Sequence, residues 1–451
     1  MVKRKWQMLG MPPEKEPVLV DYGRTALGKK RGGTLRRVRG DDMIIHCLRN
    51  IVDRTLKDFD LEKMGANGRV DSIIGCNSQI GATALDVGRT SVLAAHLPYT
   101  IPGTSVNRQC ASGMQTCYFA WQQIATGEKD IVLAGGVEAQ TTYPIMADMN
   151  VVMPGNKVQT VPPNPQISTS PYVMALAEKY GKRMSGQIAG AEIMGREWNK
   201  KIGNSYEEFR LELDQLSVAS HKKALKEHAM EMRKKEIFPM EVPALDDDGK
   251  PITDPKGRPI EGKTVTADQD EGMRPNTSVE KCQKLRGIVR RRKGYLTAGN
   301  SCPETDGAAI SIWSSREFAE EHGLPIRGTL DNWFVTGTDP ILMLTGPIES
   351  TKGLMRDAEF TLDDMDFIEI NEAFSTVVKA SCHDLGLDWK DPRLNQWGGA
   401  IAIGHPTGMT GTRLIGSLIH QLEDAQKTYG LATLCVGLGM GSACIVKREG
   451  A

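Results

Sequence analysis

The sequence predicts an α/β protein whose core is interrupted by a long inserted region. Strand and helix patterns alternate over residues 70–145, and the alternation returns from residue 307 to the end. Such alternation is typical of sheet strands covered by helices. Between these stretches the composition changes, which predicts a segment inserted into the core. A chain of 451 residues has room for about two to three domains, or for one large fold with an insertion.

The elements of the first half follow from apolar runs and from helical spacing. Pro17-Val18-Leu19-Val20 predicts the first strand, after a basic start that lacks the apolar stretch of a signal peptide. Residues 70–75 form a second apolar run ending in glycine. Apolar positions across 111–127 recur near helical spacing, and Ile131-Val132-Leu133-Ala134 predicts a buried strand before two glycines.

The inserted region has three parts of different character. Residues 145–172 are rich in Met, Pro, Asn and Thr and predict an extended covering loop. Residues 173–235 predict helices, and residues 240–280 contain Pro, Gly and acidic clusters that are typical of turns. Regular alternation resumes near Gly294.

A weak internal repeat links the two halves. Asn107–Gly113 precedes the helix that leads to the strand 131–134. Ile403–Gly408 precedes a second predicted helix, which leads to the strand Leu431–Leu434. In each copy a reactive side chain, Cys110 or His405, is followed by a glycine three positions later. This pattern indicates a duplicated unit, with chance similarity as the alternative.

Charge and cysteine usage exclude several classes of protein. With 56 basic and 56 acidic residues, the net charge is zero, which disfavours a general nucleic-acid binder. No apolar run approaches the roughly 20 residues of a membrane span. The nine cysteines show no CxxC spacing, and the eight histidines show no metal-site spacing. We therefore expect reduced thiols in a cytoplasmic setting. The nine lie at positions 47, 76, 110, 117, 282, 302, 382, 435 and 444.

Cys110 and His405 are the first candidates for chemistry. A helix beginning at Ala111 places the Cys110 thiol at its N-terminus, where free N–H groups and the helix dipole favour a thiolate. Small residues at 111–113 leave room for a ligand at the sulfur. His405, between Gly404 and Pro406, is able to take a proton from such a thiol. The structural alternatives are a buried packing cysteine and a histidine that caps a turn.

Cys435 and Asn371 are further candidates. Cys435 ends a buried strand and is followed by Gly437-Leu438-Gly439, a glycine loop whose next segment has the pattern of a strand. That order favours a tight strand–loop–strand over a phosphate cradle, with amides free to stabilise an oxyanion. Asn371 follows a predicted strand and precedes a helix, which by itself favours an N-cap. The functional alternative is a side-chain amide that orients a water or a carbonyl.

Taken together, these segments resemble the thiolase family. The matching segments, in family order, are Val106–Gln115, Gly135–Glu138, Asp270-Glu271-Gly272 with Arg274-Pro275, Thr297–Asn300, Asn371–Phe374, Gly398–Pro406 and Cys435–Gly437. They cover nearly the whole chain apart from about 145–190 and the first 16 residues. The resemblance implies a five-layer αβαβα fold of two similar halves with an inserted loop domain. The N-terminal half would span 15–145 and be completed by 286–315, the insertion 146–285, and the C-terminal half 316–451.

The resemblance also implies roles for the candidate residues. Cys110 is the nucleophile that becomes acylated, and His405 activates it. Cys435 is the acid/base for the substrate α-carbon or the leaving thiol. His405 and Asn371, the latter through a water, contribute to one oxyanion hole, and the amides of Cys110 and Gly437 form the other. The activity implied is CoA-dependent thiolytic cleavage of a 3-oxoacyl-CoA, or the reverse Claisen condensation. CoA is substrate and product, and no metal or organic cofactor is expected.

Departures from the family pattern concern substrate binding. The segment after Asn300 is Ser301-Cys302-Pro303, where many members carry a serine that touches pantetheine. Ile193-Met194-Gly195 stands where many short-chain members have His-Met-Gly. Trp397 and Leu438 also depart from the usual residues. The expected CoA- and substrate-binding residues are Met194, Ala298, Ser301 and Cys302, and a larger or branched acyl chain is as compatible as a short one.

The same resemblance implies the partners and leaves two alternative functions. The expected partners are acyl-CoA and CoA, without nucleic acid or membrane span, in a homodimer or homotetramer or in a multienzyme β-oxidation complex. One alternative is a decarboxylating β-ketoacyl synthase, although such enzymes have a Cys-His-His arrangement. The other is a non-catalytic scaffold subunit with the same fold, although all four catalytic-type residues are present.

Overall fold

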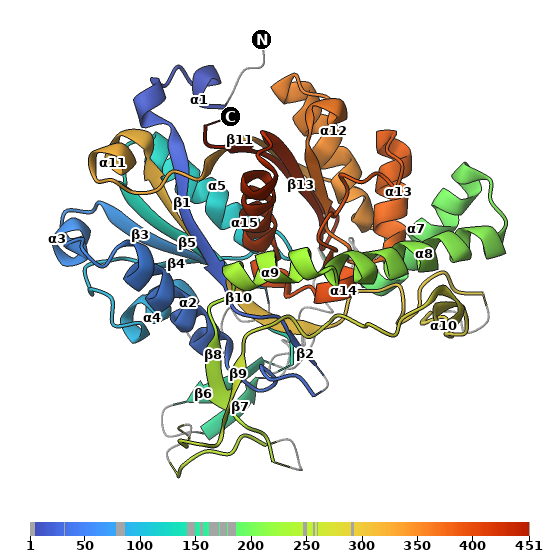
Figure 1. Ribbon diagram of the computed structural model, residues 1–451, viewed down its shortest axis with the longest axis horizontal. Coiled ribbons are helices and arrows are strands. Elements are labelled where there is room, and N and C mark those ends of the chain that lie inside the picture. The colour runs from blue at the N-terminus through green and yellow to red at the C-terminus, as the bar shows by residue number, and fades with distance from the viewer. Residues whose placement is uncertain are drawn as a thin grey trace.

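A computed structural model shows a large mixed sheet with helices on both sides of each half (Figure 1). It describes residues 5–450 except 31, 78–85, 142–148, 154–156, 162–170, 172–177, 179–185, 247–249, 256, 257, 259 and 290–292. The strand order is β12-β13-β14-β11-β1-β10-β5-β3-β4, with β2 paired to β10. A single register pair, Leu19 with Gly328, joins β1 to β11. The sheet is therefore two half-sheets connected at one point.

The two half-sheets have the same internal topology. The strands of the first are β1 (Pro17–Arg24), β2 (Gly28–Lys29), β3 (Val70–Gly75), β4 (Thr104–Val106), β5 (Ile131–Ala139) and β10 (Thr305–Ser315), and those of the second are β11 (Gly328–Gly337), β12 (Phe367–Ile370), β13 (Tyr429–Val436) and β14 (Met440–Arg448). In the first, β3 pairs with β5 in parallel, and β10 is antiparallel to both β5 and β1. In the second, β12 pairs with β13 in parallel, and β14 is antiparallel to both β13 and β11. The predicted duplication is confirmed at the level of topology.

Two helices, α5 (Ser112–Ala125) and α15 (Thr407–Ala425), pack against each other and contact strands of the half-sheets. Their close approach depends on glycine. A Cβ on Gly411 would lie 2.2 Å from the backbone nitrogen of Met114, and one on Gly136 would lie 2.1 Å from the carbonyl oxygen of Gly408. The first turn of α15 is thereby pressed against α5 and β5, so the residues just before the two helices lie on one side of the molecule.

The remaining helices cover the outer faces. α2 (Gly40–Thr55) contacts β1, β5 and β10, and α4 (Val87–Ala94) contacts β3 and β4. On the other half, α12 (Gly346–Ala358) contacts β11, β13 and β14, and α13 (Ser375–Leu385) packs beside it. This gives the five layers αβαβα. The short helices are α1 (Lys5–Met8), α3 (Leu61–Ala66), α11 (Arg316–Glu321) and α14 (Ala400–Ile403).

The inserted region is helical in its middle, as the sequence predicts. It contains α7 (Gln187–Ile202), α8 (Tyr206–Ala224), α9 (Glu227–Glu236) and α10 (Val279–Gln283). α8 begins with a capping box in which Ser205 and Glu208 satisfy each other's backbone N–H groups. The stretch 240–280 is more regular than its turn-like composition suggests, because β8 (Met240–Pro243) and β9 (Thr264–Ala267) pair as a hairpin. Within 145–172, the expected covering loop contains the paired strands β6 (Met149–Met153) and β7 (Lys157–Val161); much of the rest lies outside the described residues.

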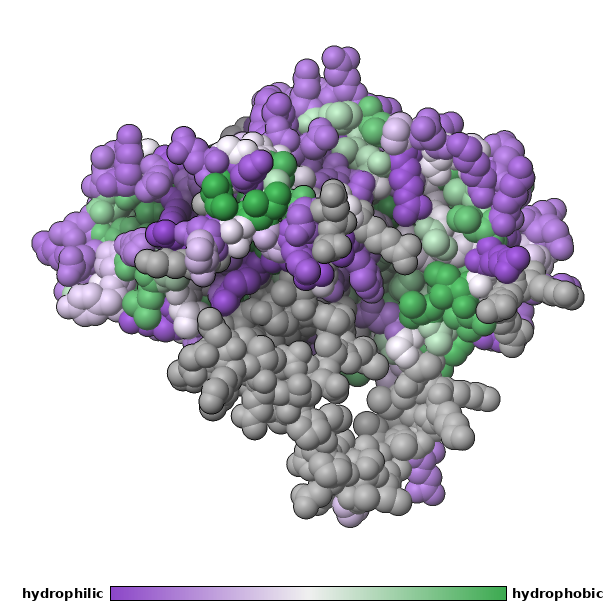
Figure 2. All heavy atoms as spheres, turned by 90° about the horizontal axis from the view of Figure 1, so that it is seen from below, coloured by the Kyte–Doolittle hydropathy of each residue, from purple (hydrophilic) through white to green (hydrophobic). Residues whose placement is uncertain are grey.

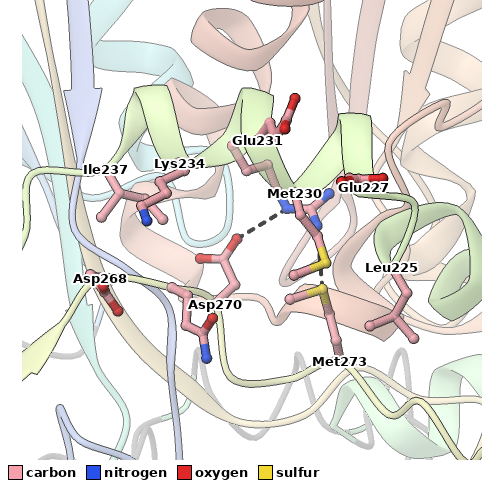
Figure 3. A pocket seen from close by; sticks show the side chains of 11 residues that line it. Leu225, Glu227, Met230, Glu231, Lys234, Ile237, Asp268, Asp270 and Met273 are labelled. Atoms are coloured by element: carbon pink, nitrogen blue, oxygen red, sulfur yellow. Dashed lines mark hydrogen bonds and ion pairs between the residues drawn. The ribbon is translucent and has the colours of Figure 1, made fainter.

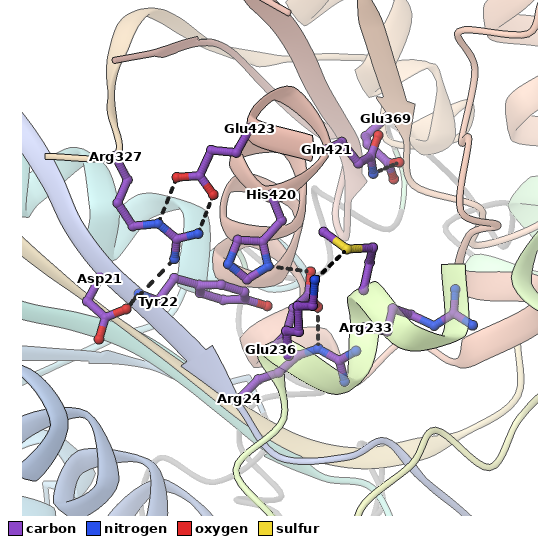
Figure 4. A network of polar contacts seen from close by, with 12 residues as sticks. Asp21, Tyr22, Arg24, Arg233, Glu236, Arg327, Glu369, His420, Gln421 and Glu423 are labelled. Atoms are coloured by element: carbon purple, nitrogen blue, oxygen red, sulfur yellow. Dashed lines mark hydrogen bonds and ion pairs between the residues drawn. The ribbon is translucent and has the colours of Figure 1, made fainter. Parts of the chain in front are cut away.

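A buried ion-pair network attaches the insertion to the core (Figure 4). Arg24 of β1, which has no exposed surface, donates to Glu236 of α9 at 2.8 Å and to Asp270 at 2.7 and 3.0 Å. Arg233 lies 3.4 Å from Asp270, and His420 of α15 lies 3.3 Å from Glu236. Burial alone would raise the pKa of Glu236, but Arg24 and His420 lower it to about 2. Glu236 is thereby kept as a charged partner of Arg24.

Figure 2 shows apolar patches set among hydrophilic residues on one face of the molecule. Of the helices that the structure describes, none combines the length and apolar character needed to cross a membrane.

Candidate active site

Cys110 lies in a tight turn directly before α5, close to where the sequence places it. The helix begins at Ser112, with Ala111 as its N-cap. The Ser112 hydroxyl donates to the Gln109 carbonyl at 2.7 Å and accepts from the Arg108 amide at 2.9 Å. These bonds hold Gln109 in a left-handed conformation, with φ of 48°. Cys110 is 2% exposed, so its thiol is held at the start of the helix with little solvent around it.

The Cys110 sulfur is surrounded by hydrogen-bond donors. Burial raises the pKa of this thiol to about 11. Opposing this shift, hydrogen bonds from the Gln187 side chain and from the backbone amides of Gly437 and Cys110 lower the pKa. The Gln187 Nε2 atom lies 3.6 Å from the sulfur. The surroundings therefore supply the donors that a thiolate or an oxyanion needs.

The loop after Cys435 is a tight connection between two antiparallel strands, as predicted. Cys435 lies in β13, and Gly437-Leu438-Gly439 lead into β14. Gly437 lies against Gln109, because a Cβ on this glycine would be 3.1 Å from the Gln109 Oε1 atom. The loop therefore reaches the turn that carries Cys110. Leu438 sits at φ 67° and is 63% exposed.

His405 is held in one tautomer by its neighbours. Its Nδ1 atom lies 2.8 Å from the Thr410 hydroxyl, which itself donates to the Pro406 carbonyl at 2.8 Å. Since the Thr410 proton is used there, Thr410 accepts from His405, and the imidazole proton is on Nδ1. The unprotonated Nε2 then accepts from the Asn371 amide nitrogen at 3.3 Å. Burial, and then the charge of Arg413, lower the pKa of His405 to about 3, so the ring is neutral with its lone pair on Nε2.

Asn371 extends past the end of β12 and does not cap the following helix. α13 begins at Ser375, with Phe374 in the N-cap position, so the N-cap interpretation of Asn371 is wrong. The Asn371 backbone amide donates to the Thr433 carbonyl of β13 at 2.9 Å. Its side-chain Oδ1 atom is buried and accepts no hydrogen bond from the described residues. An acceptor of this kind beside His405 is available to a ligand.

Three thiols influence one another in this region. Burial and then the charges of Cys110 and Cys302 raise the pKa of Cys435 well above its usual value. Burial, with Cys110 next, raises the pKa of Cys302 to about 12. The Cys302 backbone donates to the Ala373 carbonyl at 3.0 Å, two residues after Asn371. Cys110, Cys302 and Cys435 therefore share one electrostatic environment in which the neutral thiol is favoured.

The residues predicted to bind CoA occupy different environments. Cys302 is half-buried beside the thiols, and Ser301 donates to the Thr297 carbonyl at 2.8 Å. Ala298 is exposed, and its carbonyl accepts from Arg274 at 3.4 Å. Met194 has no exposed surface and belongs to the hydrophobic cluster that also contains Cys435. Contacts of these residues with CoA stay predictions.

Trp397, one of the departures from the family pattern, packs toward the insertion. It is 5% exposed and forms a small cluster with Ala229 and Met232 of α9. Its carbonyl accepts from Arg233 at 2.7 Å. The nearby Asn395 supports the end of β12. Its side-chain amide donates to Glu372 at 2.9 Å and to the Ile370 carbonyl at 3.0 Å.

One well-formed pocket lies apart from these residues. It has a volume of about 400 Å³, with α9 on one side and the segment 268–273 on the other (Figure 3). Asp270 and Arg233 line it as part of the buried ion-pair network. None of the predicted site residues lines it. The candidate site is therefore the group of residues around Cys110, away from this pocket. In the part of the chain that is described, no group of three or more His, Cys, Asp and Glu could hold a metal ion.

Two residues at the site, Thr410 and Gln187, were not predicted from the sequence. Thr410 lies five positions after His405, where a hydroxyl in the first turn of the predicted helix was a usable signal. Gln187 lies 77 positions from Cys110, and nothing in its local sequence marks it.

Comparisons with known proteins agree with this architecture. Residues 17–317 match the family described as thiolase, N-terminal domain, and residues 324–448 match thiolase, C-terminal domain. A 3-ketoacyl-CoA thiolase of Pseudoalteromonas translucida is 33% identical over 434 residues, covering 96% of this chain and 98% of that protein. A 3-ketoacyl-CoA thiolase of Bacillus subtilis is 34% identical over 432 residues, covering 95% and 98%.

Solved structures show the same similarity. The acetyl-CoA acetyltransferase of Bacillus anthracis superposes with a TM-score of 0.75 at 27% identity, covering 96% of this chain and 98% of that one. Human mitochondrial 3-ketoacyl-CoA thiolase gives a TM-score of 0.75 at 25% identity, covering 97% and 100%.

Proposed function

Because this chain belongs to the thiolase family, we propose that it is an acyltransferase acting on 3-oxoacyl-CoA. It catalyses thiolytic cleavage to acetyl-CoA, or another short acyl-CoA, and a shortened acyl-CoA, or the reverse Claisen condensation, through an acyl-Cys110 intermediate. The observation that carries the proposal is the convergence of donors on the Cys110 sulfur at the start of α5.

The first half-reaction uses the neutral His405 as base. Its Nε2 lone pair takes the proton of Cys110, and the resulting thiolate attacks the 3-keto carbon of the substrate. The backbone amides of Cys110 and Gly437 donate to the oxygen on which negative charge develops. Each such donor contributes about 3–4 kcal/mol of barrier lowering. A histidine with a pKa of about 3 stays unprotonated at neutral pH, so Nε2 keeps a lone pair, which accepts from the Asn371 amide at 3.3 Å until it takes the thiol proton.

The second part of this half-reaction breaks the carbon–carbon bond. The Cα–Cβ electron pair becomes the enolate of the departing acyl-CoA, and the Cys435 thiol protonates the α-carbon. Burial and neighbouring thiols keep Cys435 protonated in the resting enzyme, which suits a proton donor. Asn371, through a water, and His405 face the enolate oxygen. The Cys435 thiolate then takes the proton of a second CoA thiol, which attacks the acyl-Cys110 carbonyl. Cys110 leaves as a thiolate and regains its proton from His405.

The proposal extends to the setting of the enzyme. Relatives carrying the name 3-ketoacyl-CoA thiolase support a role in acyl-CoA degradation by β-oxidation. We place it in the cytoplasm as a homodimer or homotetramer, alone or with a partner subunit. All nine cysteines are free thiols, which supports a reducing compartment. The chemistry requires no metal or resident organic cofactor, since CoA is both substrate and product.

The test combines a substrate panel with trapping of the intermediate. The protein is assayed for CoA-dependent cleavage of 3-oxoacyl-CoA substrates that differ in chain length and branching. Mass spectrometry without added CoA should detect the acyl group on Cys110. Cys110→Ser should abolish both cleavage and labelling. Glu304, an exposed residue two positions after Cys302, can be changed to Gln as a surface control. Undiminished cleavage by Cys110→Ser would exclude the proposed mechanism.

A further inference from the structure

Gln187 is the first residue of α7 and approaches the nucleophile from the inserted region. Its Nε2 atom lies 3.6 Å from the Cys110 sulfur, and its side chain is half-buried. No motif of the sequence analysis includes this residue. The contact therefore brings a side chain from outside the two α/β halves to the atom where the proposed chemistry occurs.

α7 is anchored to the rest of the protein by buried polar contacts. Glu192 has no exposed surface and accepts from the backbone amides of Tyr295 and Leu296, at 3.0 and 3.1 Å. Asn199 donates to the Tyr295 hydroxyl at 3.1 Å, and Trp198 donates to Asp384 at 3.0 Å. A side chain at the start of a helix held in this way keeps its position better than one on an unanchored loop.

The chemistry of the contact favours one charge state of the sulfur. An amide N–H is a donor without charge, and its bond to an ionised sulfur is stronger than its bond to a neutral thiol. Burial opposes ionisation of Cys110, and the Gln187 side chain is the first of the groups that counteract burial. A thioester sulfur accepts hydrogen bonds weakly, so the contact loses most of its strength once Cys110 is acylated.

We propose that Gln187 is a further catalytic residue, whose Nε2–H group stabilises the Cys110 thiolate both as attacking nucleophile and as leaving group in the deacylation step. The inference rests on the proposed role of Cys110 as nucleophile. It assigns to the inserted region a part in the chemistry, besides its cover over the core.

The test measures the ionisation of Cys110 directly. Iodoacetamide alkylation of the full-length protein is followed by peptide mass spectrometry as a function of pH. Gln187→Leu removes the donor, and Gln187→Glu places a carboxylate of nearly equal size beside the sulfur. Lys200→Met, on the exposed side of the same helix and paired with Glu197 at 3.1 Å, is the matched control. Thermal unfolding shows whether each variant is folded.

The expected result is a graded loss. At a fixed pH below the midpoint, Cys110 should be alkylated about tenfold more slowly in Gln187→Leu, which corresponds to a midpoint about one pH unit higher. Gln187→Glu should react more slowly still, because the carboxylate repels the thiolate. The single-turnover rate of deacylation by CoA should fall with the same order, and Lys200→Met should match the wild type.

Two outcomes overturn the inference. Alkylation midpoints that equal the wild-type value in both Gln187 variants would show that the amide does not stabilise the thiolate. A lower kcat with an unchanged midpoint would show that Gln187 only shapes the acyl pocket. A failure of the proposed function has a different signature: wild-type protein alkylated fully at Cys110 would still cleave 3-oxoacyl-CoA.

Discussion

Thr410→Val removes the hydroxyl that accepts the Nδ1 proton of His405 while nearly preserving the shape of the side chain. In the wild type the Nδ1–Oγ1 distance is 2.8 Å, and both groups are buried. In the variant the Nδ1–H group has no acceptor at that position, which costs about 1–3 kcal/mol. Moving the proton to Nε2 relieves this cost, but it removes the lone pair that the proposed base requires.

Either outcome lowers the population of the competent tautomer. A penalty of 1–3 kcal/mol corresponds to a decrease in kcat/KM of about 5- to 150-fold. Thr410→Ser keeps the hydroxyl and should retain activity within a few-fold of the wild type. The assay is the steady-state thiolysis of a 3-oxoacyl-CoA substrate across pH, with iodoacetamide alkylation of Cys110 measured in parallel.

A folded Thr410→Val variant that keeps kcat/KM within twofold of the wild type would refute this role of the Thr410 hydroxyl. Equal losses of activity in Thr410→Ser and Thr410→Val would refute it as well, because the hydroxyl would then not be the relevant group. A loss restricted to the valine variant is the result that the hydrogen-bond geometry predicts.

Other consequences of the structure can be measured in unfolding experiments. Gly411→Ala should destabilise the protein by about 1–3 kcal/mol or more, because the new Cβ would lie 2.2 Å from the backbone nitrogen of Met114. Gly190→Ala, whose Cβ would have its nearest neighbour at 3.5 Å, should be neutral or stabilising by up to about 1 kcal/mol. Equal effects of the two substitutions in urea unfolding would contradict this account. Arg24→Met should cost about 3–5 kcal/mol by removing the buried cation that Glu236 and Asp270 share. Lys200→Met should cost less than about 1 kcal/mol. A small effect at Arg24 would mean that the insertion is held by other contacts. Burial lowers the folded-state pKa of His405 to about 3, so between about pH 6.5 and 3 the unfolded chain binds a proton that the native protein does not. Native stability should therefore fall as the pH drops through this window, by at most about 1.4 kcal/mol per pH unit from this residue, and the slope of unfolding free energy against pH should be shallower in His405→Gln than in the wild type.

Features that depend on short stretches of chain were predictable from the sequence. The turn before α5, the glycine loop between β13 and β14 and the repeated order of elements follow from local spacing, glycine placement and apolar runs. Cys110, His405 and Cys435 could therefore be singled out before any coordinates were considered. The thiolase resemblance rests on short segments of this kind, which are distributed along nearly the whole chain.

Contacts between distant segments required the folded protein. Local sequence favoured an N-cap role for Asn371, but α13 begins four residues later and the side chain turns toward His405. No local pattern indicated that Gln187 lies at Cys110, or that Met194 belongs to the buried cluster that contains Cys435. Trp397 faces α9, which no local pattern indicates.

The sequence by itself determined the candidate residues for the chemistry and the class of fold that holds them, because helix starts, turns and strand periodicity are encoded over a few neighbouring positions. Only the tertiary structure decided the charge state and tautomer of those residues. A pKa depends on burial and on charges that come from any part of the chain, and the His405 tautomer depends on Thr410 and Asn371, which reach the ring from different elements. Such three-dimensional neighbours are set by the packing of the whole molecule.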